Sequence, residues 1–546
     1  MRGLMMESPL TIKSIALHAQ TQHGHQEIVS VFAGGDKRRH TFSDCLSRAR
    51  KVSNLLKKIE LSNSARVGTL AWNNFRHLEL YYGVSCSGYV LHTINPRLFE
   101  EQLIYIINHA EDEVLFYDSE FSSLVEKIQP HCSNIKAFIE LADEEKAPHD
   151  KPNFYNYEKL LTDLTDDYDW PDLDENEASS LCYTSGTTGN PKGVLYSHRS
   201  TVLHSYGVSL PDSACLSAMD SILAVVPMFH VNAWGYPYAG MMVGAKMVFP
   251  GPLLGDPKTL VELINEEEVT IAGGVPTVWT AMLAYLNEHN LKLGKMNRTI
   301  IGGSACPLTM IREFRDKYGV EVLHGWGMTE MSPIGVINQP KSNNVKLSGD
   351  ALDSQLVKQG RPVPGVQVKI VGSDGKDLLW DGVNFGSLKV KGPWVCSEYY
   401  QLSGDEGSHD EDGWFETGDV AVIDPDGYVK ITDRTKDVIK SGGEWISSID
   451  LENVALMHPK IKECAVVGLY HPKWEERPLL VVVSSQPNTT SKRELLDFFI
   501  GKVAKWWVPD DVVFVEQLPL NATGKVSKLS LREELSEYVF PSNLDG

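Results

Sequence analysis

The amino-acid sequence predicts an α/β fold with a large N-terminal domain of layered α/β sheets plus a β-rich lobe, followed by a small C-terminal α+β domain. Three observations lead to this prediction. The chain has 546 residues, which is too long for one compact core. Strand and helix patterns alternate over most of its length, as in largely parallel sheets covered by helices. From about residue 361 the sequence pattern changes to one typical of short strands joined by Asp-Gly turns.

The elements of the large domain follow in order along the chain. Apolar residues spaced three and four apart predict a helix over 46–59. Short apolar runs predict buried strands at 65–72 and 113–118, and a helix over 99–110 lies between them. Alternating strand and helix patterns then continue from 221 to 327, so this whole region is expected to form α/β layers.

The second half of the chain reads differently. Short strands with Asp-Gly turns at 365–378, 386–392 and 421–434 form the predicted β-rich lobe. A further segment of strands and helices begins after the stretch 433–447. We therefore predict an N-terminal domain over 1–433, a hinge at 434–436 and a C-terminal domain over 437–546.

Composition excludes several classes of protein. The formal net charge of -21 disfavours a nucleic-acid partner, because neutralising phosphates requires clustered Lys and Arg. The eight cysteines form no CxxC pair, which argues against a zinc knuckle or a thioredoxin-like site. No run reaches the roughly 18 apolar residues of a membrane span, and the apolar run at the N-terminus is too short for a signal peptide. We expect a cytoplasmic protein with reduced thiols.

The stretch 183–193, "YTSGTTGNPKG", carries the first chemical signal. Glycines let backbone N–H groups approach an anion closely, hydroxyl groups add donors, and one lysine adds a positive charge, so the loop suits a polyphosphate. It is not a Walker A loop, because Gly193 stands where that motif needs Ser or Thr after the lysine. Alone, it could also be a surface loop that happens to be rich in Gly and Thr.

Four further motifs follow in order: "GWGMTE" at 325–330, "TGD" at 417–419, "DRTKDVIKSGGEWIS" at 433–447 and "NATGK" at 521–525. With 183–193 they span the chain, and the set resembles the AMP-forming acyl-CoA synthetases, whose superfamily also holds luciferases and peptide-synthetase adenylation domains. The stretch 433–447 is most similar to medium- and long-chain fatty acyl and methylmercaptopropionate CoA ligases. The resemblance implies an enzyme that uses ATP, Mg²⁺ and CoA.

The resemblance also implies roles on the ATP side. Lys192 and Glu330 are expected to be catalytic, and Thr184 with Glu330 is expected to hold Mg²⁺. Asp419 fits the ribose hydroxyls, and Arg434 adds a donor to the ribose or a phosphate. Trp326 stands where most relatives carry an adenine-stacking Tyr, although a Trp packed in the core is the alternative. The expected ATP/AMP set is Thr184, Ser185, Gly186, Thr187, Thr188, Gly189, Gly302, Gly303, Ser304, Trp326, Gly327, Met328, Thr329, Asp419 and Arg434.

The acyl side is read from "PMFHVNAWG" at 227–235. Peptide-synthetase domains place an Asp after the Phe to hold an amino group, whereas this chain has His230, which argues against an amino-acid substrate. His230 and Trp234 resemble residues that gate the acyl and pantetheine passages, with His230 also expected to be catalytic; either could be plain core. Gly327 stands where acetyl-CoA synthetases carry a pocket-closing Trp. We therefore expect space beside Trp326 for acids larger than acetate.

The C-terminal domain is expected to be mobile, as in the family it resembles. Lys525 bridges the carboxylate and the α-phosphate in this reading, and Lys436 is the hinge residue. The remaining residues expected at the acyl and CoA passages are Pro333, Lys440, Gly442, Gly443, Glu444 and Trp445. Rotation about the hinge would present Lys525 first and the face with Lys440 second.

The resulting prediction is an ATP-dependent carboxylic acid–CoA ligase that works through acyl-AMP. Its partner is a small carboxylic acid of short to medium chain length or with a thioether, and 3-methylmercaptopropionate is a specific candidate. A homodimer is also considered. Two alternatives stay open: a luciferase-like or stand-alone adenylating enzyme, which needs no CoA, and a nucleotide-binding scaffold, which would be expected to have lost Glu330 or Lys525.

Overall fold

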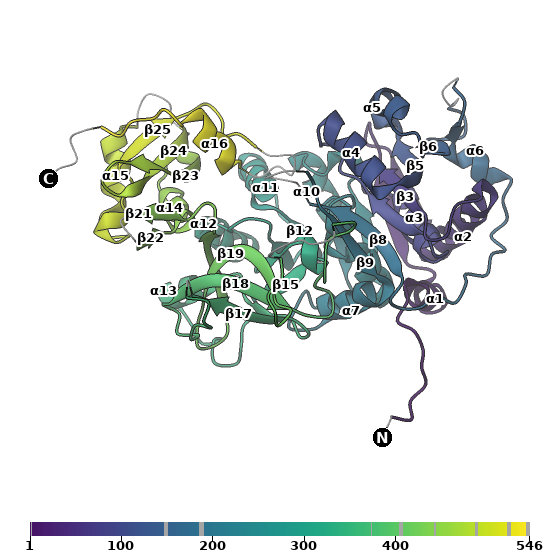
Figure 1. Ribbon diagram of the computed structural model, residues 1–546, viewed down its shortest axis with the longest axis horizontal. Coiled ribbons are helices and arrows are strands. Elements are labelled where there is room, and N and C mark those ends of the chain that lie inside the picture. Colours follow the sequence, from purple (N-terminus) through teal and green to yellow (C-terminus); the bar gives the residue numbers. More distant parts are fainter. Residues whose placement is uncertain are drawn as a thin grey trace.

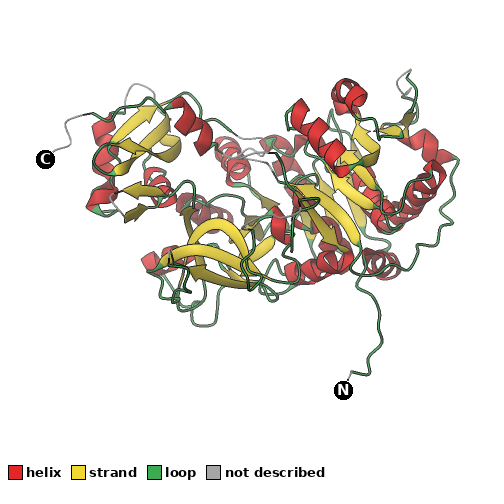
Figure 2. Ribbon diagram, in the orientation of Figure 1, coloured by secondary structure: helices red, strands yellow, loops and turns green. Residues whose placement is uncertain are grey.

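The computed structural model describes residues 1, 3–146, 151–184, 190–372, 374–402, 408–441, 444–485, 490–520 and 526–541, except the side chains of Glu444 and Trp445. Figures 1 and 2 show helices packed on both sides of twisted sheets, with the C-terminal lobe at the end of the molecule away from α1–α6. The predicted α/β architecture of a large N-terminal part and a smaller C-terminal part is confirmed.

One sheet of the large part has the order β7-β6-β5-β3-β4-β8-β9. Neighbours from β7 to β8 are parallel and β9 is antiparallel to β8, so this sheet follows the predicted pattern. Its strands are β3 Arg66–Leu70, β4 Val90–Thr93, β5 Asp112–Asp118, β6 Ala137–Leu141, β7 Phe154–Asn156, β8 Ala178–Tyr183 and β9 Gly193–Ser197.

The other α/β sheet has the order β16-β15-β14-β13-β12-β10-β11-β1-β2. Its centre is parallel and both edges end in antiparallel pairs. Its strands are β1 Glu27–Val31, β2 Lys37–Thr41, β10 Ser221–Ala224, β11 Lys246–Phe249, β12 Ile271–Gly274, β13 Arg298–Ile301, β14 Glu321–Gly327, β15 Ile334–Ile337 and β16 Arg361–Pro362.

Helices connect and cover these strands. The predicted helix over 46–59 starts four residues earlier, because Thr41 and Asp44 form a capping box that satisfies the free backbone N–H groups of the first turn. The helices of the large part are α1 Ile12–His23, α2 Phe42–Ile59, α3 Phe75–Ser85, α4 Glu100–Ala110, α5 Ser122–Ile128, α6 Tyr157–Thr162, α7 His198–Ser209, α8 Val231–Trp234, α9 Tyr236–Val243, α10 Pro257–Glu266, α11 Pro276–His289, α12 Leu308–Glu313 and α13 Gly349–Leu356. No helix among the described residues is both long and apolar enough to cross a membrane.

The β-rich lobe is an antiparallel sheet in the order β17-β18-β19-β20, as the Asp-Gly turns predict. The C-terminal sheet is mixed, with β22-β21-β24-β23 antiparallel and β25 parallel to β24. The elements are β17 Gln367–Val371, β18 Phe385–Lys391, β19 Phe415–Ile423, β20 Val429–Arg434, β21 Ile439–Ser441, β22 Glu444–Ile446, α14 Ser448–Ala455, β23 Ile461–His471, β24 Glu475–Ser484, α15 Lys492–Phe499, β25 Asp511–Phe514 and α16 Lys528–Glu534.

The chain passes from the large part to the C-terminal part between β20 and β21. Buried Asp433, near the end of β20, accepts a hydrogen bond from the backbone N–H of Ser448 at 2.7 Å, at the start of α14. Lys430 on the same strand pairs with Asp450 at 2.7 Å. These contacts hold the last strand of the large part against the first helix of the small part.

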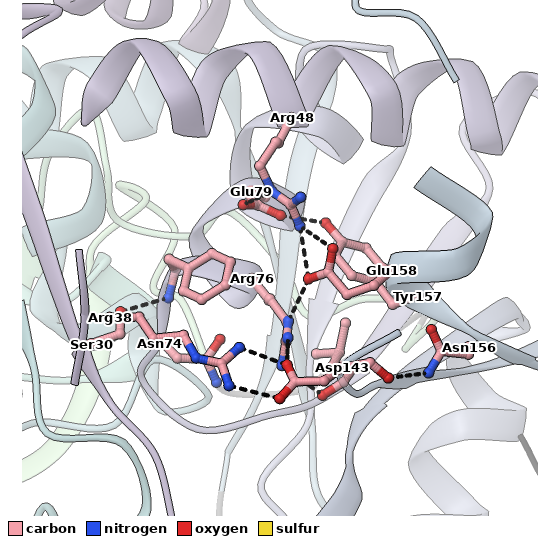
Figure 3. Close-up of polar contacts among 12 residues, drawn as sticks. Ser30, Arg38, Arg48, Asn74, Arg76, Glu79, Asp143, Asn156, Tyr157 and Glu158 are labelled. Carbon is pink, nitrogen blue, oxygen red and sulfur yellow. Dashed lines mark hydrogen bonds and ion pairs between the residues drawn. The ribbon is translucent and has the colours of Figure 1, made fainter. Parts of the chain in front are cut away.

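A cluster of ion pairs joins the two α/β sheets (Figure 3). Arg38 from β2 makes two hydrogen bonds of 2.6 Å with Asp143, which follows β6 in the other sheet. Buried Arg76 from α3 also bonds Asp143 and reaches Glu158 at 2.8 Å. The Arg38 guanidinium, together with Arg76, holds the pKa of Asp143 well below its usual range. Arg48 closes the cluster by bonding Glu158 and Glu79.

We expect Asp143→Asn to lower the free energy of unfolding by about 1–2 kcal/mol at pH 7, because two arginines lose their carboxylate at a site that is only partly screened by water. A carboxyl with a depressed folded pKa stabilises the fold above its unfolded pKa of about 4 and loses that contribution as the pH falls below it. The difference between wild type and variant should therefore shrink on acidification.

Urea unfolding between pH 7 and pH 3 measures this difference. Asp172→Asn is the matched control, because Asp172 pairs with Lys13 at 2.7 Å but its side chain is 97% exposed. Equal stabilities of Asp143→Asn and wild type at pH 7 would show that the cluster does not hold the sheets together.

Candidate functional site

The predicted phosphate loop connects two paired strands. Tyr183 at the end of β8 pairs with Gly193 at the start of β9. The backbone N–H of Thr184 donates to Lys192 O at 2.9 Å, and the backbone N–H of Lys192 donates to Thr184 Oγ1 at 3.2 Å. Both ends of the loop are thereby fixed. The predicted residues Ser185, Gly186, Thr187, Thr188 and Gly189 lie outside the described residues, and their phosphate contacts stay predictions.

Lys192 and Glu330 both contact Tyr399. The ammonium of Lys192 lies 4.5 Å from the ring centre of Tyr399, an arrangement in which the ring face attracts the cation. The hydroxyl of Tyr399 donates to Glu330 Oε1 at 2.7 Å. The sequence prediction named Lys192 and Glu330 from their motifs but missed Tyr399, which no local pattern distinguishes from its neighbour Tyr400.

The side chain of Glu330 is buried, so this carboxylate is not a solvated surface group. Burial raises the pKa of Glu330, while the Tyr399 hydrogen bond opposes this rise. No described side chain donates to the second carboxylate oxygen, Oε2. The short turn that carries Glu330 is itself held, because Tyr196 Oη donates to Thr329 O at 2.6 Å and the backbone N–H of Cys396 donates to Glu330 O at 2.7 Å.

The predicted adenine and ribose residues lie together at the border of β14 and the β-rich lobe. Trp326 Nε1 donates to Asp419 Oδ2 at 2.8 Å, and Arg434 lies 3.5 Å from Asp419 Oδ1 because the two residues face each other across β19 and β20. Asp419 is buried. One of its oxygens is therefore already used to orient the indole of Trp326.

The Gly302–Ser304 segment follows β13 and lies beside this group. Gly302 is buried, whereas Gly303 and Ser304 are exposed and Gly303 has a φ of 83°. A Cβ atom added to Gly302 would lie 3.0 Å from Gly325 O and 3.4 Å from Trp234 Cη2. The close packing explains the glycine and places Trp234, from the predicted acyl side, next to the predicted adenine loop.

Gly327 faces the backbone of Pro333, which corrects the prediction made for this glycine. We expected this glycine to leave open space beside Trp326, but a Cβ atom added there would lie 2.0 Å from Pro333 O and 2.8 Å from Pro333 C. The backbone N–H of Met328 donates to the same Pro333 carbonyl at 3.1 Å. Close approach of two backbone segments, and not an open pocket, accounts for Gly327 and for the position of Pro333.

His230 precedes α8 and Trp234 is its last residue, and α8 follows a loop after β10. Both side chains are half-buried. In the C-terminal lobe, Lys440 is exposed and pairs with Trp445 across β21 and β22. The backbone of Glu444 pairs with Ser441 in the same hairpin. The predicted residues Gly442, Gly443 and Lys525 lie outside the described residues, and Lys436 lies between β20 and β21.

Comparisons with known proteins agree with this geometry. Residues 16–400 match the family model described as AMP-binding enzyme, and residues 450–525 match the AMP-binding enzyme C-terminal domain. The chain is 53% identical to a 3-methylmercaptopropionyl-CoA ligase of Ruegeria lacuscaerulensis, over 98% of this chain and 99% of that protein. It is 51% identical to a medium-chain-fatty-acid–CoA ligase of Ectopseudomonas oleovorans, over 100% and 99%.

Among solved structures, the fold matches that of ATP-bound MatB from Rhodopseudomonas palustris with a TM-score of 0.82. The sequence identity is 26%, and the match covers 96% of this chain and 99% of that one.

We expect Gly327→Ala to destabilise the fold by roughly 1–3 kcal/mol or more and to displace the turn that carries Glu330, because backbone atoms cannot move aside as a flexible side chain can. Gly325→Ala is the control in the same strand, since a Cβ atom there would lie at an ordinary 3.5 Å from Val336 O. Urea unfolding of both variants measures the effect. Equal stability of the two variants would contradict the close backbone packing at Gly327 and would favour an open pocket there.

Proposed function

The chain belongs to the AMP-binding enzyme family and is an AMP-forming acid–CoA ligase, and we propose that its acid is of short to medium chain length or carries a thioether. Acid and ATP give acyl-AMP and pyrophosphate, and CoA then gives acyl-CoA and AMP. The observation that carries the site assignment is the group Lys192–Tyr399–Glu330, which places a cation and a buried carboxylate beside the predicted phosphate loop.

The first half-reaction joins two anions. An oxygen of the acid attacks the α-phosphorus, the bond to the bridging oxygen breaks, and pyrophosphate leaves. In our proposal Thr184 and Lys192 bind the β- and γ-phosphates and offset their charge. Trp326 stacks on adenine, its indole fixed by Asp419, while Asp419 and Arg434 contact the ribose. These contacts position the α-phosphate for in-line attack.

The second half-reaction exchanges oxygen for sulfur at the acyl carbon. The CoA thiolate attacks the carbonyl carbon of acyl-AMP, and AMP leaves with the oxygen that came from the acid. We propose that Lys440, Glu444, Trp445 and the neighbouring Gly442 and Gly443 form the pantetheine channel after rotation about Lys436. Lys525 acts in the first half-reaction only.

The residues present fit Mg²⁺. This ion prefers oxygen ligands, takes one or two from the protein and completes its shell with phosphates and water. Glu330 offers a buried carboxylate whose Oε2 has no donor among the described side chains, and Thr184 offers a hydroxyl in the loop. When bound, the ion would neutralise charge on the phosphates.

The choice of acid rests on the relatives and on His230. Relatives that share about half of the sequence are named for 3-methylmercaptopropionate and for medium-chain fatty acids. His230, where an amino-acid-activating enzyme is expected to carry Asp, leaves no carboxylate for a substrate ammonium. We propose 3-methylmercaptopropionate as the specific acid, with fatty acids of similar length as the nearest competitors.

We further propose a cytoplasmic enzyme. All eight cysteines lie within the described residues and none of them forms a disulfide bond, as suits a reducing compartment. Cell fractionation would overturn this if the protein were found outside the cytoplasm. The homodimer considered from the sequence stays a proposal that light scattering at micromolar concentration decides.

The acid preference is tested by pyrophosphate release and thioester formation over acids from acetate to palmitate, with 3-methylmercaptopropionate included. We expect kcat/KM to peak at 3-methylmercaptopropionate or at a short- to medium-chain fatty acid, with thioester formed only when CoA is present. A maximum at acetate would contradict the proposed acid. Turnover of acyl-AMP without CoA would favour the luciferase-like alternative.

Glu330→Gln should raise the Mg²⁺ concentration needed for half-maximal rate and lower the rate at saturation, because an amide is a weaker ligand than a carboxylate. The measurement is pyrophosphate release across a Mg²⁺ titration, with circular dichroism to verify the fold. Glu321→Gln, an exposed residue at the other end of β14, is the control. An unchanged Mg²⁺ requirement would remove Glu330 from the metal site.

Lys525→Ala should slow acyl-AMP formation by about 10²–10³, the usual effect of losing one well-placed electrostatic donor. With presynthesised acyl-AMP and CoA, the same variant should form thioester at nearly the wild-type rate. Lys436→Pro should form acyl-AMP and then stall before thioester formation, because proline stiffens the hinge. An equal loss in both half-reactions of Lys525→Ala would contradict the lobe alternation.

A further inference from the structure

The turn Val231–Trp234 has an unusual backbone. The φ angles of Val231, Asn232, Ala233 and Trp234 are 47°, 50°, 47° and 56°, and Gly235 follows at 83°. Residues with a side chain visit this left-handed region mostly one at a time, because Cβ then crowds the next carbonyl group. A run of four such residues persists only if its surroundings hold it.

Asn232 is the residue that holds this turn. Its side chain is buried, and its Nδ2 donates to Ser180 Oγ at 3.1 Å. The Tyr81 hydroxyl, which has one proton, donates to Met228 O at 2.6 Å, just before the turn, and also lies 3.1 Å from Asn232 Oδ1. The backbone carbonyl of Asn232 accepts from Gly235 N–H at 2.9 Å. Asparagine also tolerates the left-handed region better than most residues.

The contacts of this turn reach the predicted phosphate loop at one end and the predicted adenine loop at the other. Ser180 lies on β8, the strand that leads directly into Thr184 and the predicted phosphate loop. At the other end of the turn, Trp234 packs beside Gly302 in the predicted adenine loop. The turn therefore spans the space between the two segments proposed to bind ATP, and it presents His230 and Trp234 from that position.

We propose that Asn232 is a positioning residue for acid selection. Its amide holds the left-handed turn, and the turn keeps His230 and Trp234 where they limit the length of the bound acid. Without the amide, the turn relaxes toward ordinary right-handed or extended conformations and both side chains move. This inference rests on the proposed function, because it assumes that His230 and Trp234 border the acid.

The test compares acids of different length. For each variant, kcat/KM is measured by pyrophosphate release with 3-methylmercaptopropionate and with a longer fatty acid, and the ratio is compared with wild type. We expect Asn232→Ala to change this ratio about tenfold, a factor that corresponds to the free energy of about one buried hydrogen bond, while the KM for ATP changes less than threefold. The ratio for Asn232→Gly should fall between those of wild type and Asn232→Ala, because glycine accepts a positive φ but lacks the amide.

Two controls separate positioning from general stability. Asn156→Ala removes another buried asparagine amide with two donor contacts, remote from this turn. Asn290→Ala removes an exposed asparagine with a φ of 50° at the end of α11. Both should keep the wild-type ratio even where they lower stability. Ser180→Ala, which removes the acceptor for Nδ2 and keeps the Asn232 amide, should shift the ratio in the same direction as Asn232→Ala and guards against a variant that does not fold.

The outcomes distinguish the two proposals. A folded, active Asn232→Ala with the wild-type ratio would overturn this inference alone, and so would an equal shift in Asn156→Ala. A wild-type protein that releases no pyrophosphate with any acid would overturn the proposed function. A shifted ratio in Asn232→Ala and Ser180→Ala, with both controls unchanged, would support the positioning role.

Discussion

In the proposed site, Glu330 is buried beside the predicted phosphate loop and has to keep a carboxylate oxygen for a ligand, and much of the proposed arrangement follows from this requirement. Removing a carboxylate from water disfavours its charged form, which is the direction of its pKa shift here. Tyr399 compensates by donating to one oxygen, and its ring face carries the Lys192 ammonium. Tyr399 thus contacts both the Lys192 ammonium and the Glu330 carboxylate.

The same requirement explains why the site draws on several sheets. The chain is acidic overall, with a formal net charge of -21, while every substrate of the proposed reaction is an anion. Attraction therefore has to come from local cations and donors. Lys192 follows β8, Glu330 follows β14, and Asp419 and Arg434 pair across β19 and β20. Strand ends from the two α/β sheets and the β-rich lobe have to converge before these groups can cooperate.

The sequence predicted those parts of the site that depend on local chemistry. Glycines, hydroxyl groups and a lysine in 183–193 predict a phosphate loop, and the described ends of this stretch, Tyr183 and Gly193, pair with each other. Tyr399 and Asn232 could not be predicted, because their roles come from side chains far away in the sequence. The sequence indicated an open space at Gly327, whereas the structure shows that the Pro333 carbonyl faces this glycine. The helix 42–59 begins four residues before the start predicted from its apolar spacing, because the polar residues that cap it are not part of that spacing.

The most direct test of the acyl-AMP route follows the oxygen atoms. When the acid carries ¹⁸O in its carboxylate, one labelled oxygen should appear in the AMP released with the thioester, and the pyrophosphate should stay unlabelled. This result is required if the acid oxygen attacks the α-phosphorus and leaves with AMP. Label in inorganic phosphate together with ADP, or thioester formed with no label in AMP, would contradict the route through acyl-AMP.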